Sequence, residues 1–303
     1  MGRTVADTIR RLTKEHLDSG RGMNIGQCLT AVGWVQNTIP EQIDGNIELP
    51  MTDVAGAGFA VGIALMGKRP ILVIRFQSLL WLNASPIVNH AAKSKELFGV
   101  PCPIFIRAIA SEGGGQGPVH TNCYHSIFMH MPGISVVAPM TPREYVQVWD
   151  HYLAHDDPML VSEHRRSYTS ADELPDMIEK DAEITLFAIS AARFEALNAI
   201  RLLKSKGIKA NLVNLVWLKP FRLDDRLLST LNSSRCGIVI DSGYEICGAS
   251  QSIAYELMLA SGKPVKAVGQ FDYSPGAATH LENGTPKAER IFQAAEIMIS
   301  NLW

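Results

Sequence analysis

The chain has 303 residues, 47% of them hydrophobic and 19% charged, which is enough to bury two cores of ordinary size, and we expect two domains. Lys plus Arg number 28 and Asp plus Glu number 30, so the net charge of −2 gives no electrostatic reason to expect nucleic acid or an anionic membrane as a partner. The five scattered cysteines (Cys28, Cys102, Cys123, Cys236 and Cys247) form no CxxC pair, which favours reduced, mostly buried thiols over a disulfide framework or a zinc site.

The first residues, MGRTVADTIRRLTKEHL, carry charges where a secretory signal needs an apolar core. We therefore expect the chain to stay in the cytoplasm. The most apolar segment, residues 54–67, is shorter than the roughly 20 residues that span a bilayer, and it contains four glycines. It predicts a buried helix.

Apolar runs of strand length alternate with helical patterns, which is typical of layered α/β domains with mostly parallel sheets. In the first half the expected strands are 69–76, 102–109, 133–139 and 158–163, and the expected helices are 55–66, 83–98, 124–131 and 142–154. A polar, uneven segment with a proline then follows at 165–183. We therefore predict a first domain at 1–170 and a linker at 171–182.

The alternation restarts in a second domain at 183–303, which we expect to be a compact open sheet. Its expected strands are 184–190, 209–217, 236–242 and 264–270, and its expected helices are 192–206, 223–232, 250–261 and 287–302. The connections have the short lengths that are usual in α/β units.

Three histidines occur within residues 112–133, EGGGQGPVHTNCYHSIFMHMPG. Residues five apart in a helix diverge by about 140°, whereas two metal ligands on one face need i, i+4 spacing, so no metal site is predicted. The glycines at 113–115 and 117 predict a loop that ends near His120, with Thr121 or Asn122 as the N-cap of a helix. His120 would then lie at the mouth of the sheet as a catalytic candidate, and His125 and His130 would be packing or surface residues.

Two other motifs are weaker. GAGFAVG, residues 56–62, lacks the GxGxxG spacing of a dinucleotide site, and its small residues favour close helix packing. DSGYEICGAS, residues 241–250, follows a buried strand, and a phosphate-binding turn there is an open alternative.

A family resemblance is carried by LPMTDVAGAGFAVGIALMGKRPI (49–71) and GPVHTNCYHSIFMHMPGISVVAPMTP (117–142). These segments resemble the beta subunit of the thiamine-diphosphate-dependent decarboxylase component of 2-oxoacid dehydrogenase complexes, in the wider transketolase superfamily. The resemblance extends to LVWLKPF (215–221) and DYSPGAATHLE (272–282). It implies an α/β fold of two open, mostly parallel sheets: a thiamine-diphosphate pyrimidine-binding domain followed by a transketolase C-terminal-like domain.

The resemblance also implies an active site. In the family a glutamate hydrogen-bonds N1′ of the cofactor's pyrimidine and favours the imino tautomer that removes the thiazolium C2 proton. Asp53 is the aligned residue, and its side chain is one methylene shorter, about 1.5 Å of reach. An alternative role for Asp53 is the N-cap of a helix that begins at Val54. His120 aligns with the histidine that faces the thiazolium.

Further pocket residues follow from the same alignment. Phe76 corresponds to an aromatic position near the pyrimidine, with Met51, Arg75 and Leu79 around it. Relatives often carry Gln and Tyr where this chain has Arg75 and Leu79, so we expect an altered lining. Gly26-Gln27-Cys28 replaces the usual Gly-Glu-Asp, which puts the acidic route between paired active sites in doubt.

The family divides its cofactor between two chains. An alpha-type subunit supplies the diphosphate and Mg²⁺ site through a GDG motif and a following Asn, and this sequence contains no GDG. The resemblance therefore implies an alpha-type partner, an α2β2 heterotetramer and thiamine diphosphate shared between chains. Some members of the family hold a monovalent cation, and the resemblance would place one near residues 155–158.

Three functions follow from these observations. The first is an enzyme subunit that cleaves or transfers the acyl or ketol unit of a 2-oxo compound. The second is the C-terminal half of a split transketolase-like enzyme, and the third is a degenerate subunit with a role in assembly or regulation.

Overall fold

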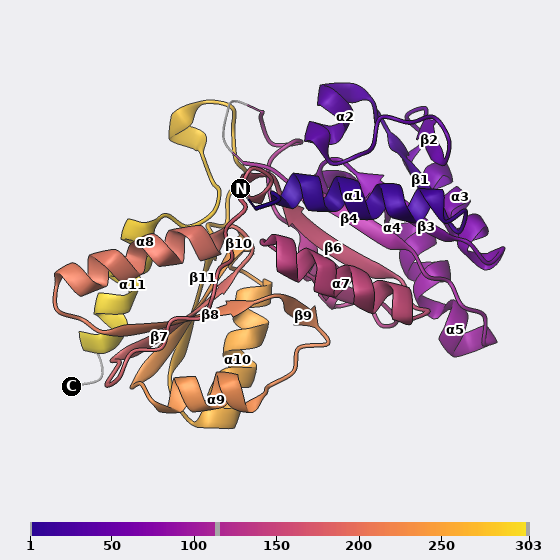
Figure 1. Cartoon of the computed structure of the whole chain (residues 1–303). Helices are drawn as coiled ribbons and strands as arrows, with labels where there is room; N and C mark the ends of the chain where they lie inside the picture. The colour runs from indigo at the N-terminus through magenta and orange to yellow at the C-terminus, as the bar shows by residue number, and fades with distance from the viewer. Residues whose placement is uncertain (1, 113–115, 301–303) are drawn as a thin grey trace. The chain divides into compact units, whose positions relative to one another are not determined.

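The computed structural model describes residues 2–112 and 116–300 of the chain, which form two compact units (Figure 1). The first unit comprises the residues up to 111 together with 119–173, and the second comprises 112–118 together with the residues from 174 onward. Each unit is built on its own parallel sheet. In the part of the chain that the structure describes, no helix has the length and apolar character needed to cross a membrane.

The sheet of the first unit has the strand order β2-β1-β3-β4-β6-β5. Every neighbouring pair of these strands is parallel. The strands are β1 (Gly22–Gln27), β2 (Asn46–Leu49), β3 (Arg69–Ile74), β4 (Phe105–Ala110), β5 (Ser135–Val137) and β6 (Met159–His164). The inner strands β3, β4 and β6 are buried at every residue, because helices cover both faces of the sheet.

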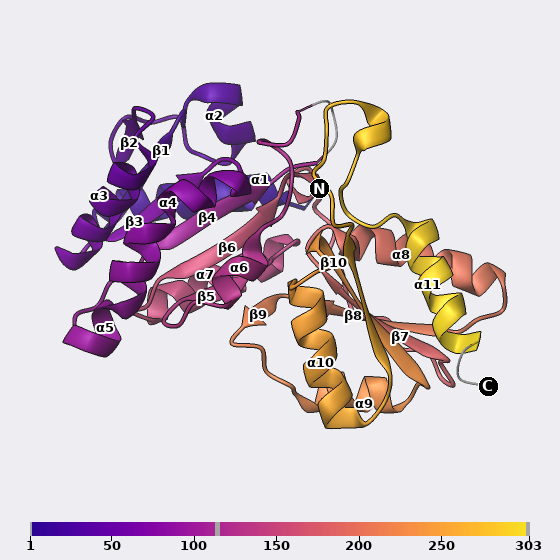
Figure 2. The ribbon, with the colours of Figure 1, turned by 180° about the vertical axis from the view of Figure 1, so that it is seen from behind.

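Helices cover both faces of this sheet. Figure 1 shows α1 and α7 side by side on one face, and Figure 2 shows α4 and α6 on the other. The helices are α1 (Val5–Asp18), α2 (Ala31–Asn37), α3 (Asp53–Leu65), α4 (Leu80–Pro86), α5 (Ala92–Phe98), α6 (His125–Met129) and α7 (Pro142–Ala154). Short turns at Gln77–Leu79 (η1), Ile87–Ala91 (η2) and Arg165–Ser167 (η3) adjoin them.

Sequence signals at the helix ends explain where several of these helices begin. Thr4 and Asp7 form a capping box at the start of α1. At α7 the Thr141 hydroxyl accepts a hydrogen bond from the Glu144 amide, and Pro142 occupies the first helical position, where its missing N–H costs nothing.

The second unit is an open parallel sheet of strand order β11-β10-β7-β8. Its elements are β7 (Ile184–Ile189), α8 (Ala192–Ser205), β8 (Ala210–Leu215), β9 (Trp217–Lys219), α9 (Asp225–Asn232), β10 (Cys236–Tyr244), α10 (Ala249–Ser261), β11 (Val265–Gln270), the turn η4 (Thr279–Leu281) and α11 (Ala288–Ser300). Helices α8 and α11 pack against each other and share one apolar core with strands β7, β8 and β10.

The expected fold class, α/β with two mostly parallel sheets, is confirmed, and most expected elements occur within a few residues of their predicted bounds. The expected helix 83–98 is broken into α4, a π-helical turn and α5. The last residues of the expected helix 287–302 and the glycines 113–115 of the expected loop lie outside the described residues. The free thiols are confirmed: Cys102, Cys123 and Cys236 are buried, and Cys28 and Cys247 are exposed.

Two expectations about helix starts are wrong. Helix α6 begins at His125 with Tyr124 as its N-cap, because the Asn122 amide instead bonds the Ser111 carbonyl in a β-bridge. Helix α3 begins at Asp53 itself, so Asp53 is not its N-cap. The N-cap residue is Thr52, whose hydroxyl donates to the Pro50 carbonyl.

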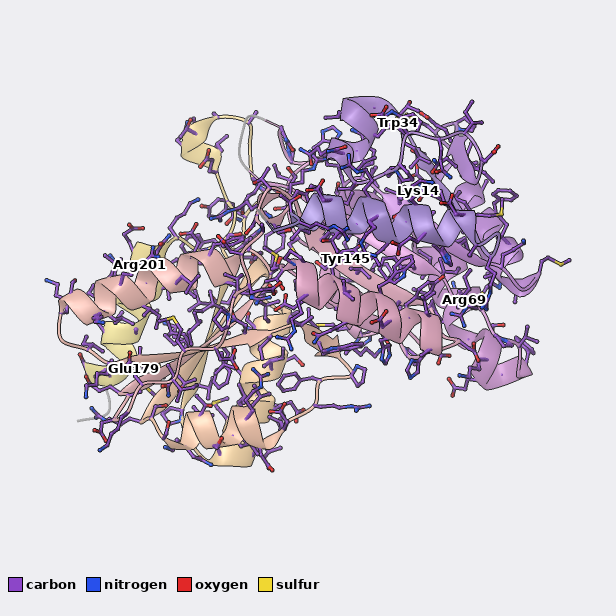
Figure 3. The ribbon with its side chains drawn as sticks, in the orientation of Figure 1. Lys14, Trp34, Arg69, Tyr145, Glu179 and Arg201 are labelled. Carbon is purple, nitrogen blue, oxygen red and sulfur yellow. The ribbon has the colours of Figure 1, made fainter. Side chains whose placement is uncertain are left out.

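A charged cluster lies inside the first unit, where Arg107 of β4 is fully buried. Its guanidinium donates to both oxygens of Glu163, from Nε to Oε1 at 2.6 Å and from Nη2 to Oε2 at 2.9 Å, and Nη2 also donates to Thr38 Oγ1 at 2.9 Å. Tyr145 of α7 (Figure 3) and Tyr168 donate their hydroxyls to the same carboxylate. Burial and the adjacent Glu163 charge raise the pKa of both tyrosines, so they remain proton donors.

Candidate functional site

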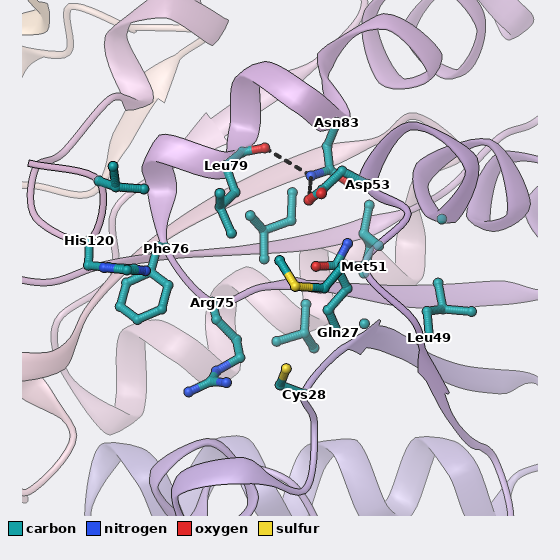
Figure 4. Close-up of a pocket in the computed structure, with 16 residues that line it drawn as sticks. Gln27, Cys28, Leu49, Met51, Asp53, Arg75, Phe76, Leu79, Asn83 and His120 are labelled. Carbon is teal, nitrogen blue, oxygen red and sulfur yellow. Dashed lines mark hydrogen bonds between the residues drawn. The ribbon is translucent and has the colours of Figure 1, made fainter.

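A cavity of about 280 Å³ lies in the first unit, at the carboxyl ends of β1, β2 and β3. This is the edge at which open parallel sheets bind ligands. Its lining is mostly apolar, with an acid, an amide, a guanidinium and an imidazole among the polar groups (Figure 4). The lining residues are Gly26, Gln27, Cys28, Leu49, Met51, Asp53, Gly56, Leu72, Val73, Ile74, Arg75, Phe76, Leu79, Asn83, Val119 and His120.

The acid of the cavity is Asp53, in the first turn of α3, and it is half-buried. Asn83 of α4 donates from Nδ2 to Asp53 Oδ1 at 3.1 Å, and the same nitrogen donates to the Leu79 carbonyl at 2.9 Å (Figure 4). In the described residues Asp53 has no ion-pair partner. The position at a helix N-terminus stabilises a negative charge.

Helix α3 approaches the strand edge closely at one position. A Cβ on Gly56 would come within 2.8 Å of Leu49 Cδ1, so the end of the Leu49 side chain would have to turn aside for a larger residue. Gly56 and Ala57 are buried, whereas Ala55 is exposed. Gly56 therefore makes the close approach of α3 to the strand edge, and Ala55 faces away from it.

The opposite wall of the cavity is aromatic and basic. The rings of Phe76 and His120 meet edge to face, with centroids 4.5 Å apart. The guanidinium of Arg75 lies 5.7 Å from the Phe76 centroid, and that of Arg165 lies 4.6 Å from it. Figure 4 shows Arg75 extending away from Asp53, toward the side of the cavity where Cys28 lies.

Among the residues that the structure describes, the two arginines have no acidic partner. In the described part of the chain, Arg165 donates one hydrogen bond, to the Arg75 carbonyl at 3.2 Å, and the Arg75 guanidinium donates none. Burial lowers the pKa of Arg165, and the Arg75 charge lowers it further. Uncompensated guanidinium groups beside a cavity favour an anionic ligand.

The loop that carries His120 is held by a buried polar network. The Gln77 side chain accepts from the Tyr124 amide at 2.7 Å and donates to the Ala108 carbonyl at 3.0 Å and to Ser162 Oγ at 2.8 Å. The Ser78 hydroxyl donates to the Val119 carbonyl. His120 itself is exposed at the cavity, where a ligand can reach its ring.

His125 plays a different part, because its ring is fully buried. Its Nδ1 lies 2.9 Å from Ser162 Oγ and 3.0 Å from Cys123 Sγ. The packing role that the sequence suggested for His125 agrees with this position. His130 is the C-cap residue of α6.

The structure brings all six sequence-predicted site residues to this cavity: Met51, Asp53, Arg75, Phe76, Leu79 and His120. Met51 lies at its rim and is 78% exposed. Sequence reasoning missed Asn83 and Arg165. The signal for Arg165 was its position directly after a buried strand, whereas an asparagine inside a helical pattern gives no comparable signal for Asn83.

Two parallel α/β units, with a cavity at the strand ends of the first, define a transketolase-like architecture. Family comparison agrees: the transketolase pyrimidine-binding domain matches residues 30–170, and the transketolase C-terminal domain matches residues 176–291. The chain belongs to this family as a beta-like subunit of the 2-oxoacid dehydrogenase E1 class.

The class within the family follows from curated relatives. The chain is 27% identical over 237 residues to the beta subunit of acetoin:2,6-dichlorophenolindophenol oxidoreductase from Cupriavidus necator, covering 74% of this chain and 70% of the relative. It is 25% identical over 268 residues to the beta subunit of the pyruvate dehydrogenase E1 component from Rickettsia felis, covering 82% of each.

Solved structures share the fold. A split-gene transketolase, described as an inactive beta4 tetramer, superposes with a TM-score of 0.75 at 17% identity over 99% of both chains. Transketolase from Campylobacter jejuni gives a TM-score of 0.69 at 17% identity, and this chain spans 46% of its length.

Proposed function

We propose that this chain is the beta-type subunit of a thiamine-diphosphate-dependent enzyme that cleaves or transfers the acyl or ketol unit of a 2-oxo compound. An alpha-type subunit that holds the diphosphate and Mg²⁺ completes the site, in an α2β2 assembly. The observation that carries the proposal is the convergence of Asp53, Phe76 and His120 on one cavity at the strand ends.

The cavity suits the aminopyrimidine of the cofactor. An apolar slot lined by Phe76, Leu79 and Leu49 accepts a flat ring, and the Asp53 carboxylate in the same slot accepts a hydrogen bond from a ring nitrogen. When bound, thiamine diphosphate would supply the nucleophilic carbon for the 2-oxo carbonyl. Asp53 would orient the ring, and His120 would hold or move a proton at the substrate.

The arginines support a substrate with an acidic group. Arg75 and Arg165 flank Phe76 without a carboxylate partner among the described residues, so an anionic substrate would remove an unfavourable like-charge arrangement. Both a 2-oxo acid and a ketose phosphate carry such a group. A 2-oxo acid is the substrate class favoured by the pyruvate dehydrogenase E1 beta relative.

The test uses the chain purified together with its alpha-type partner, Mg²⁺ and thiamine diphosphate. Turnover of 2-oxo acids and of ketose phosphates is compared for the natural pair and for Asp53→Ala, with the surface carboxylate variant Asp18→Ala as control. We expect Asp53→Ala to lower kcat by about 10²- to 10⁴-fold and the control to change little. Equal turnover in both variants would remove the assigned role of Asp53.

The substrate class has its own test. Replacing Arg75 with Gln removes the charge, and loss of a hydrogen bond to a charged group costs about 1.5–3 kcal/mol. We expect KM for the acidic substrate to rise about 10- to 100-fold with kcat little changed, and KM for an uncharged 2-oxo ester to stay the same. Calorimetry that detects no cofactor binding by the pair would favour the degenerate, regulatory subunit instead.

A further inference from the structure

The hydrogen bond between Asn83 and Asp53 has a definite orientation. Only the NH₂ side of an asparagine amide can donate to a carbonyl, and the Leu79 carbonyl lies 2.9 Å from Asn83 Nδ2. The same nitrogen therefore faces Asp53 Oδ1 at 3.1 Å, and both of its hydrogens are used. Because Asn83 is only 5% exposed, its side chain has little freedom to turn.

This bond fixes one oxygen of Asp53 and leaves the other to the cavity. In the described residues the Asp53 side chain accepts no hydrogen bond other than that from Asn83. Since Asp53 lines the cavity, Oδ2 keeps lone pairs for a ligand N–H. Figure 4 shows Asn83 behind the carboxylate, on the side away from Phe76 and His120.

The chemical nature of Asn83 matters as much as its position. A Lys or Arg at this point would form an ion pair and make the carboxylate a much weaker proton acceptor. A neutral amide restricts the rotation of the carboxylate and leaves its negative charge uncompensated. A short acid that must reach a ring nitrogen depends on such preorganisation, because a small misplacement of a reacting group costs large factors in rate.

We propose that Asn83 is a positioning residue that holds Asp53 Oδ1 so that Oδ2 meets the cofactor ring nitrogen. This inference rests on the proposed function. Asn83 acts through Asp53, because Asp53 Oδ1 and the Leu79 carbonyl use both hydrogens of Asn83 Nδ2. It also joins α4 to α3, the two helices that contribute the cavity wall on this side.

The test compares Asn83→Leu and Asn83→Ala in the pair with its alpha-type partner. The control is Asn89→Leu, because Asn89 is exposed in the adjoining turn and its side chain bonds Lys93 and the exposed Ser85. We expect kcat to fall about 10- to 100-fold in both Asn83 variants, with less than a threefold change in the dissociation constant of thiamine diphosphate. We expect the control to match the natural pair.

A second readout does not depend on turnover. Near-ultraviolet circular dichroism distinguishes the amino and imino tautomers of the bound aminopyrimidine, and we expect the imino signal to decrease in both Asn83 variants. A purely structural role would lower cofactor affinity and thermal midpoint together and leave the tautomer ratio unchanged. Asn83→Ala removes the donors without adding bulk, so it decides the question if Asn83→Leu folds poorly.

The double variant Asp53→Asn/Asn83→Leu completes the design. If Asn83 acts through the carboxylate, kcat of the double variant equals that of Asp53→Asn alone. Multiplicative losses, or an unchanged tautomer signal in the single Asn83 variants, would overturn the inference. If Asp53→Ala already leaves turnover intact, the proposed function fails; if only the Asn83 variants do so, this inference fails alone.

Discussion

The buried Arg107 and Glu163 pair allows a quantitative prediction. Arg107→Met keeps much of the side-chain volume, and it removes two hydrogen bonds to Glu163 and one to Thr38. The Glu163 carboxylate, 2% exposed, then keeps the hydrogen bonds from two tyrosine hydroxyls. Removing one partner of a buried pair costs about 3–5 kcal/mol. Since Arg107 Nη1 has no partner in the described residues, we expect a loss near 3 kcal/mol, the lower end of that range.

Urea unfolding measures this loss in free energy. Tryptophan fluorescence reports on the same unit, because Trp149 of α7 is 4% exposed and packs against Phe105 of the neighbouring strand. The control is Arg10→Ala, which breaks a half-exposed pair with Asp7 and should cost less than about 1 kcal/mol.

A double-mutant cycle tests the physical reason. Arg107→Met combined with Glu163→Leu removes both charges, so no isolated buried carboxylate remains. We expect the double variant to lose less free energy of unfolding than the sum of the two single variants. A loss for Arg107→Met no larger than that of Arg10→Ala would refute the argument that the pair is desolvated and coupled.

Two further predictions concern stability. Gly133 has φ of +74°, and a Cβ there would lie 1.7 Å from the Ala92 carbonyl oxygen, whereas Gly99 has φ of +68° with open space around it. Gly133→Ala should therefore lower the free energy of unfolding by more than Gly99→Ala does. Equal losses in urea unfolding would contradict the steric argument. Burial lowers the pKa of His16 below 6.5, so the unfolded chain binds a proton more readily and stability falls as pH drops below about 6.5. His16→Gln should therefore reduce the change of the thermal midpoint with pH between about pH 5 and 7. An unchanged slope of midpoint against pH would contradict this role of His16.

Much of the fold followed from apolar runs, because a strand buried on both faces must be apolar throughout. Residues 69–76 and 158–163 were predicted as strands for this reason, and β3 and β6 are buried at every residue. The strands β1 and β2 were missed. Asn24 of β1 is fully buried, and its side chain donates a hydrogen bond to Asn46 of β2 at 2.8 Å. A buried asparagine interrupts the apolar run by which a buried strand is recognised in the sequence.

Some residues of the candidate site were assigned from the sequence, and others were found only in the tertiary structure. Asp53, Phe76 and His120 are chemical groups that the sequence and its family resemblance could assign, because residue type and order along the chain carry that information. Asn83 and Arg165 depended on tertiary structure. A hydrogen bond between α3 and α4, and a guanidinium above a ring nearly 90 residues earlier in the chain, exist only once the strand ends meet at one edge of the sheet.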